Sequence, residues 1–214
     1  LHSTSRRQRQ MCIRDSYPTM LYHAPYYSFG INPCCWSKVF KKELLEQCLY
    51  PVTPKVKIGE DAAFTYPCLL AAESLAYVDG CLYHYRNNAQ SMTAAFDPHL
   101  TETIFIPLDI LRTYFDTDKR ALFAQYQMYA AYLLQLWVRN QASLDCDLDR
   151  KGLQQSCARV CQNQELRALL ASVPGALPRQ VAVAVRAVQQ QKPGQLYLLI
   201  KAWNLYYKLR NGRA

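Results

Sequence analysis

The chain has 214 residues, half of them apolar, and a formal net charge of +9. This length favours one domain or slightly more, with enough apolar side chains for a sizeable core. No apolar run reaches the roughly 18 residues that a membrane-spanning helix needs, which excludes a bilayer-crossing chain on this pattern. Nine cysteines, an odd count without a CxxC pair, favour reduced thiols and a cytoplasmic protein.

The first 16 residues, "LHSTSRRQRQMCIRDS", hold four arginines against one acid and show no apolar periodicity. They also lack the hydrophobic region of a signal peptide. The segment closely resembles translated sequencing-adapter read-through, which implies a non-native, disordered tail (1–16) on a piece of a longer protein. A natural disordered basic arm is the alternative. Because this tail carries part of the charge and no nucleic-acid-binding motif is found, nucleic acid is not an expected partner.

The segment 17–35 is rich in tyrosine and proline and is expected to be irregular. A helix is predicted over 36–50, because apolar residues recur there at helical spacing: Trp36, Val39, Phe40, Leu44 and Leu45. A loop, 51–59, ends at Gly59.

A second helix is predicted to begin at Glu60, because Glu60 and Asp61 in its first turn complement the helix dipole. Pro67 should kink or shorten it. Residues 74–86 are predicted to form two short strands about a turn at Asp79-Gly80. A polar loop follows over 87–93.

From residue 99 onward the pattern is typical of helices, predicted over 99–142, 149–161, 163–172, 179–191 and 194–210. Cys157 and Cys161 lie one helical turn apart, but no further zinc ligands are evident, so they are expected to be core thiols.

The last helix, 194–210, places five apolar residues on one face and is flanked by basic residues without acids: Leu196, Leu199, Ile200, Trp203 and Tyr207, with Lys201, Lys208, Arg210 and Arg213. Two interpretations stay open for this helix. It lies on an anionic membrane surface, at the inner face of the plasma membrane, or its apolar face packs onto the helical region.

Four segments in order carry a family resemblance: "WSKVFKKELL", "IGEDAAFTYPCLL", "LAYVDGCLYHYR" and "NNAQSMT". Together they resemble the second half of a bacterial family 2 glycosyltransferase of the GT-A fold, over roughly residues 30–96. The implied fold class is α/β: the acceptor-side half of a GT-A domain over 17–98, followed by a mostly α-helical region over 99–214.

The resemblance implies that Asp61 is the catalytic base, taking the proton of an acceptor hydroxyl that attacks a nucleotide-sugar with inversion. Glu60 would orient the acceptor or hold a backbone amide. Without the resemblance, both acids are read as stabilising a helix N-terminus.

The motifs also imply substrate contacts for Trp36, Lys38, Tyr85 and Arg86. Lys38 and Arg86 suit a diphosphate or an acceptor carboxylate, and an ion pair with Glu60 or Asp79 is the alternative. His84 is a candidate metal ligand, or a packed side chain. Ser91 and Thr93 are expected to stabilise their own loop.

Such enzymes hold the nucleotide-sugar donor in a preceding half that ends in a D-x-D motif, whose acids bind Mg²⁺ or Mn²⁺. The D-x-D triplets here, 116–118, 145–147 and 147–149, all follow Asp61 and are interpreted as linker and helix-capping acids. We therefore expect the chain to lack the nucleotide-binding half, to bind neither metal nor donor tightly, and to be inactive alone. The parent enzyme would act on a saccharide or lipid-linked acceptor.

A different interpretation is a non-enzymatic helical interaction module that binds a membrane surface or a protein partner. It draws on the helical majority of the chain and its basic end. A strand-rich upstream sequence with its own D-x-D would favour the enzyme over the module.

Overall fold

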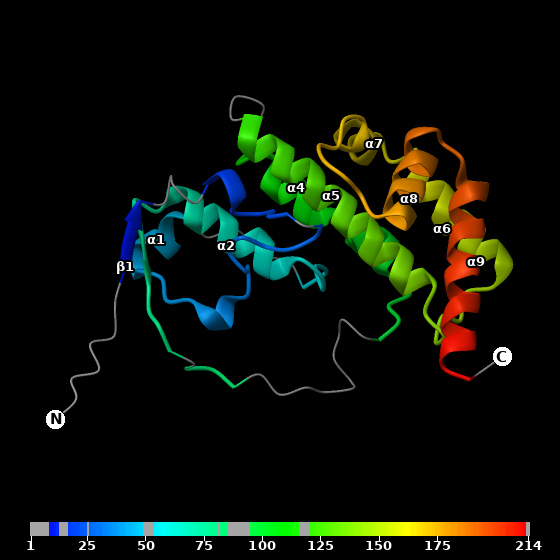
Figure 1. Ribbon diagram of the computed structural model, residues 1–214, viewed down its shortest axis with the longest axis horizontal. Helices are drawn as coiled ribbons and strands as arrows, with labels where there is room; N and C mark the ends of the chain where they lie inside the picture. The colour runs from blue at the N-terminus through cyan, green and yellow to red at the C-terminus, as the bar shows by residue number, and fades with distance from the viewer. Residues whose placement is uncertain are drawn as a thin grey trace.

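The computed structural model describes residues 9–12, 17–24, 26–48, 54–80, 82–84, 95–115 and 120–212 (Figure 1). This part of the chain is mostly α-helical, which agrees with the helical region predicted over 99–214. Its helices are α1 (Lys42–Gln47), α2 (Glu60–Ala71), α3 (Leu100–Thr103), α4 (Ile106–Arg112), α5 (Arg120–Gln141), α6 (Arg150–Gln162), α7 (Gln164–Leu170), α8 (Arg179–Gln189) and α9 (Pro193–Arg210). The α/β organisation expected over 17–98 is not confirmed, because α2 is the main element there and β2 (Ser74–Tyr77) the one strand among its described residues.

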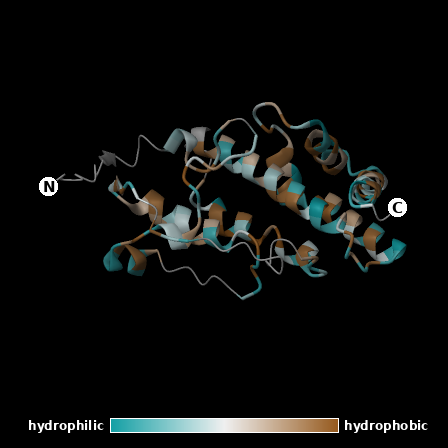
Figure 2. Ribbon diagram, turned by 60° about the horizontal axis from the view of Figure 1, so that its bottom comes forward, coloured by the Kyte–Doolittle hydropathy of each residue, from teal (hydrophilic) through white to brown (hydrophobic). Residues whose placement is uncertain are grey.

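The long helix α5 runs through the centre of the molecule, with α2 and α4 toward one end and α6 to α9 around the other (Figure 1). It packs against α3, α7, α8 and α9, and α2 packs against α4. Figure 2 shows both hydrophobic and hydrophilic segments along this central helix. Its buried residues, among them Tyr129, Leu133 and Trp137, belong to one core that also includes residues of α2 and α9. A single core therefore joins the two ends of the molecule.

Helix α2 begins at Glu60, as predicted, after Gly59 in the left-handed conformation with φ of 90°. Pro67 does not shorten it, because the helix continues to Ala71. The proline removes one backbone hydrogen bond of the helix, and side chains beside it tie the helix to the preceding loop. Thr65 donates to the Pro33 carbonyl at 2.6 Å, and Tyr66 donates to the Ile31 carbonyl at 2.9 Å.

The single helix predicted over 36–50 is wrong. The structure has a 3-10 turn, η2 (Cys35–Ser37), and then the short helix α1, with Lys38 extended between them. Val39, predicted on the apolar stripe, is fully exposed, at 101% of its reference area. The Lys38 amino group instead donates to the carbonyls of Asn32 and Cys34, so hydrogen bonds to the preceding loop compete with the helix that periodicity predicts here.

The hairpin predicted over 74–86 is also wrong in its second strand. Strand β2 (Ser74–Tyr77) forms as expected, but Leu82–His84 is not a strand. The partner of β2 is β1 (Arg9–Cys12), antiparallel, with Arg9 opposite Tyr77. Backbone hydrogen bonds of an open strand edge accept any extended segment, so the edge of β2 takes a partner that periodicity does not indicate. Four residues of the segment expected to be a disordered tail are thus in a strand.

The predictions for the C-terminal helices are confirmed in α6, α7, α8 and α9. Leu196 and Ile200 of α9 are fully buried, and α9 packs on α6 and α8. The packing interpretation therefore holds for this face of α9. Among the described helices, none combines the length and the apolar character needed to cross a membrane.

Candidate functional site

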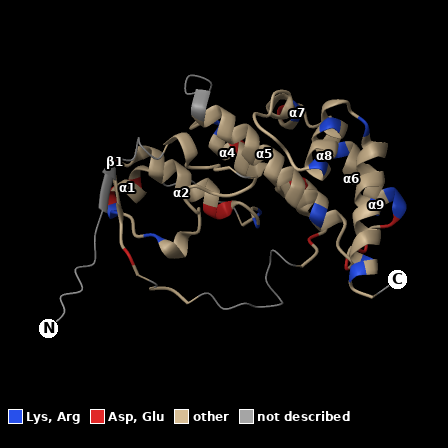
Figure 3. Ribbon diagram, viewed as in Figure 1, with Lys and Arg blue, Asp and Glu red and all other residues tan. Residues whose placement is uncertain are grey.

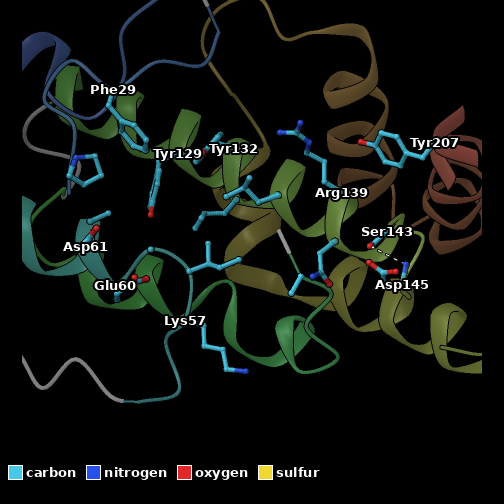
Figure 4. A pocket seen from close by; sticks show the side chains of 18 of the residues that line it. Phe29, Lys57, Glu60, Asp61, Tyr129, Tyr132, Arg139, Ser143, Asp145 and Tyr207 are labelled. Carbon is cyan, nitrogen blue, oxygen red and sulfur yellow. Dashed lines mark hydrogen bonds between the residues drawn. The ribbon is translucent and has the colours of Figure 1, made fainter. Parts of the chain in front are cut away.

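A cavity of about 940 Å³ lies between the N-terminus of α2, the C-terminal half of α5 and the end of α9 (Figure 4). Glu60, Asp61 and Tyr129 line one end of it, and Arg139 and Tyr207 line the other. Its wall combines aromatic rings with a few charged and amide groups, as binding sites for small molecules commonly do.

Gly59 brings α2 and α5 close together at the first end of the cavity. A Cβ atom there would lie 2.8 Å from Cγ of Pro107 and 2.9 Å from the hydroxyl of Tyr129. Only a residue without a side chain fits, and φ of 90° also favours glycine. The first turn of α2 is consequently set directly beside the Tyr129 hydroxyl.

Glu60 and Asp61 are both half-buried in this first turn and line the cavity. Burial raises the pKa of Glu60 above its usual value, and the adjacent charge of Asp61 adds to the increase. Burial also raises the pKa of Tyr129 strongly, with contributions from Tyr132, Glu60 and Asp61. The Tyr129 hydroxyl is therefore a neutral hydrogen-bond donor next to two carboxyl groups.

Cys35 and Lys38 approach Asp61 from the side of the 3-10 turn. Burial raises the pKa of the Cys35 thiol to about 11, and a hydrogen bond with Asp61 adds to this. Burial lowers the pKa of Lys38, while the negative charge of Asp61 opposes the decrease. The Lys38 amino group donates to the Cys34 carbonyl and to the Ser37 hydroxyl, both at 3.0 Å, so in this structure it holds the turn together.

The other residues expected to contact substrate do not gather at the cavity. Trp36 is partly exposed and stacks on Tyr83 with ring centroids 4.5 Å apart, and His84 is exposed. Within the described residues, the lining includes neither Trp36 nor Lys38 nor His84. Tyr85, Arg86, Ser91 and Thr93 lie outside the part of the chain that the structure describes.

The far end of the cavity is a region that sequence reasoning missed. Arg139 and Asn140 come from the last turns of α5, and Tyr207 comes from α9. Arg139 and Tyr207 also line a second groove, of about 410 Å³, together with Arg210. A guanidinium group suits carboxylates and phosphates. The only signal in the sequence is a cation near the end of a largely apolar helix, and periodicity alone cannot pair it with a helix far along the chain.

A metal centre does not form among the described residues, where no three His, Cys, Asp or Glu side chains come together. Asp149 caps α6, accepting from the Gly152 amide at 2.6 Å, which confirms its capping role. Residues 116–118 are outside the described part. Cys157 and Cys161 are buried in the core, as expected, and burial raises the pKa of Cys161 to about 11.

No protein-family model, curated protein or solved structure matches the chain. The functional argument therefore depends on the residues and the geometry of the cavity.

Proposed function

We propose that this chain supplies the acceptor-binding side of an inverting glycosyltransferase of family 2, with Asp61 as the general base. The observation that carries the proposal is the position of Asp61, half-buried in the first turn of α2 at one end of a cavity of about 940 Å³. A carboxylate at the wall of a cavity that admits a small molecule can reach a bound hydroxyl group.

The chemistry assigned to Asp61 is a single proton transfer. The acceptor hydroxyl oxygen forms a bond to the anomeric carbon of the donor sugar, and the bond from that carbon to the nucleoside diphosphate breaks. The electron pair of the broken bond leaves with the diphosphate, and the hydroxyl proton goes to the Asp61 carboxylate. Because the attack comes from the face opposite the leaving group, the configuration inverts.

Two neighbours support this role for Asp61. The pKa of Tyr129 is raised by burial, so its hydroxyl keeps its proton and can donate it in a hydrogen bond to an acceptor oxygen beside the carboxylate. Glu60 has a raised pKa and stands at the same end of the cavity, where it can accept from a second hydroxyl of the acceptor. The remaining volume, toward Arg139 and Tyr207, accommodates the rest of the acceptor.

The donor and its Mg²⁺ or Mn²⁺ are assigned to a different part of the parent enzyme. The described residues do not fit a divalent ion, because they bring no three suitable side chains together. Lys38, one candidate contact for the diphosphate, directs its amino group to main-chain carbonyls. The chain alone is therefore proposed to be inactive. Its proposed location is the cytoplasm or the inner face of the plasma membrane.

The experiment has two steps. Isothermal titration of this chain with UDP-sugars should show no micromolar binding. In the full-length product of the parent gene, Asp61→Asn should abolish sugar transfer while the circular dichroism spectrum stays unchanged. Glu102→Gln, an exposed acid on α3, is the control and should keep activity. Unchanged turnover of the Asp61→Asn enzyme would remove Asp61 from the catalytic role.

The alternative proposal is a helical interaction module without catalysis, favoured by exposed apolar residues on α9, namely Leu198, Leu205, Tyr206 and Leu209. The two functions are separated by the upstream part of the parent gene. A strand-rich segment with a D-x-D supports the transferase, and its absence supports the module.

A further inference from the structure

We propose that α9 places a second, exposed apolar stripe on the surface of an anionic lipid bilayer. This inference concerns exposed residues of α9 that do not line the cavity at Asp61, and it does not depend on sugar transfer.

The stripe runs along one side of α9 at the spacing of a helix face. Its members follow one another at intervals of four, three and four residues: Leu198, Ala202, Leu205 and Leu209. The three leucines are 65%, 56% and 61% exposed. Tyr206, also exposed, borders the stripe. Tyrosine rings of this kind favour the boundary between lipid and water.

The stripe is distinct from the face that holds α9 in the fold. Leu196 and Ile200 are fully buried, and Trp203 and Tyr207 pack against the core. The helix can therefore stay docked on α6 and α8 while Leu205 and Leu209 contact another surface. Packing within the fold uses one apolar side of α9, so the opposite apolar side is exposed and available to contact another surface.

Charge indicates what covers the second side. After Glu165 the chain contains no acid, and it contains eight cations: Arg167, Arg179, Arg186, Lys192, Lys201, Lys208, Arg210 and Arg213. Figure 3 shows Lys and Arg on α8 and toward the end of α9. On the wheel of α9, Lys201 and Lys208 lie on one side of the stripe and Arg210 lies on the other.

The exposed cations of α9 beside the stripe are Lys201, Lys208 and Arg210. Arg210 also lines the groove shared with Arg139 and Tyr206, which suits a lipid phosphate.

Anionic lipid is the surface that matches an apolar stripe with cations on both sides. A protein partner or a second copy of the chain would cover the leucines but would have to supply its own acids. Helices α8 and α9 themselves contain no acid, so the same surface of a second copy would supply none.

The test is co-sedimentation of the whole chain with vesicles of phosphatidylcholine alone or with phosphatidylglycerol. We expect binding to the anionic vesicles only, and weaker binding at high salt. Lys208→Gln and Arg210→Gln should each lower the partition coefficient roughly fivefold. Leu205→Asn with Leu209→Asn should abolish binding, and both sites are exposed, so the fold is kept.

Matched controls are at the other end of the molecule. Lys41→Gln and Lys55→Gln each remove one positive charge from an exposed position, and Val39→Asn removes an exposed apolar side chain. All three should leave vesicle binding unchanged. Equal binding to neutral and anionic vesicles, or full binding by the double leucine variant, would overturn the proposal. So would a dimer in sedimentation analysis that the double leucine variant dissolves, because a second copy would then cover the stripe.

Discussion

Gly59 lies so close to Tyr129 that a Cβ atom on the glycine would be 2.9 Å from the tyrosine hydroxyl. The contact joins the first turn of α2, which carries Glu60 and Asp61, to the central helix α5. At the acidic end of the cavity, the main chain at Gly59 therefore lies directly against the Tyr129 side chain. Space at this junction, as well as charge, determines where the two carboxyl groups lie.

Gly59→Ala should destabilise the protein by about 2–4 kcal/mol, from left-handed strain and from overpacking against Tyr129 and Pro107. Gly175→Ala is the matched control, because Gly175 has φ of 87° but nothing within 4 Å of the added Cβ. It should cost only the strain, about 1 kcal/mol. Urea unfolding measures both values. Equal losses at the two sites would show that the contact with Tyr129 contributes nothing.

Burial is the larger cause of the raised pKa of the Cys35 thiol, about 11, and Asp61 adds to it. Asp61→Asn should lower this pKa, because it removes the negative charge and leaves only a neutral acceptor for the thiol proton. Peptide-resolved alkylation with iodoacetamide between pH 8 and 11 measures the change as faster labelling at Cys35. Glu60→Gln is the control, since Glu60 is not among the groups that act on this thiol. A labelling profile that stays at the wild-type position would place the Asp61 carboxylate away from Cys35.

Glu60→Gln should stabilise the protein at pH 7 by about a few tenths of a kcal/mol, a value reduced by solvent screening at a half-exposed site. The pKa of Glu60 is raised in the folded protein. The folded state therefore binds the Glu60 proton more tightly than the unfolded state does. Protonated Glu60 contributes stability below the unfolded pKa, and this contribution is lost as the pH rises through the raised pKa of the folded state. The stabilisation by Glu60→Gln should disappear below about pH 4, where the Glu60 carboxyl is protonated in both states.

Urea unfolding at pH 3.5, 5 and 7 tests this pH dependence. Glu43→Gln serves as the comparison, because Glu43 is an exposed acid in the first turn of α1. It should bring no stabilisation, since it removes a favourable interaction with the helix dipole. A Glu60→Gln variant that is less stable than wild type at pH 7 would mean that helix capping outweighs the burial of the charge.

Gln125→Leu should cost about 2–4 kcal/mol, because it leaves buried main-chain groups without partners. The Gln125 side-chain oxygen accepts from the amides of Leu21 and Tyr22 at 2.8 and 3.2 Å, and its nitrogen donates to the Tyr17 carbonyl at 2.6 Å. Hydrogen exchange at the Leu21 and Tyr22 amides should accelerate.

Gln154→Leu, at an exposed position of α6, controls for the change of residue type. It should alter stability by no more than about 0.5 kcal/mol. If exchange at Leu21 stays slow in the Gln125→Leu variant, the segment is held by its apolar contacts and not by the glutamine.

Helical periodicity predicts α6 to α9 and the helical character of 99–142, because these helices bury apolar residues that recur in the sequence. It does not predict that 99–142 is divided into α3, α4 and α5. Gly59 followed by Glu60 and Asp61 likewise indicates the start of α2 from local chemistry alone. Over residues 36–50 the same reasoning is wrong, because Lys38 hydrogen-bonds to the main chain of a preceding loop. The partner of β2 was also missed, since pairing between backbones leaves no pattern in the side chains.

Sequence alone thus determined the mostly helical character of the chain, the acidic first turn of α2 and the basic end of the chain, because these depend on neighbours close along the chain. Only the tertiary structure decided that Arg139 and Tyr207 line the same cavity as Asp61. It also decided that the apolar face predicted for α9 packs on α6 and α8, where the sequence left packing and a membrane surface both open. Periodicity identifies such a face, but what covers it depends on the surface that the neighbouring helices present.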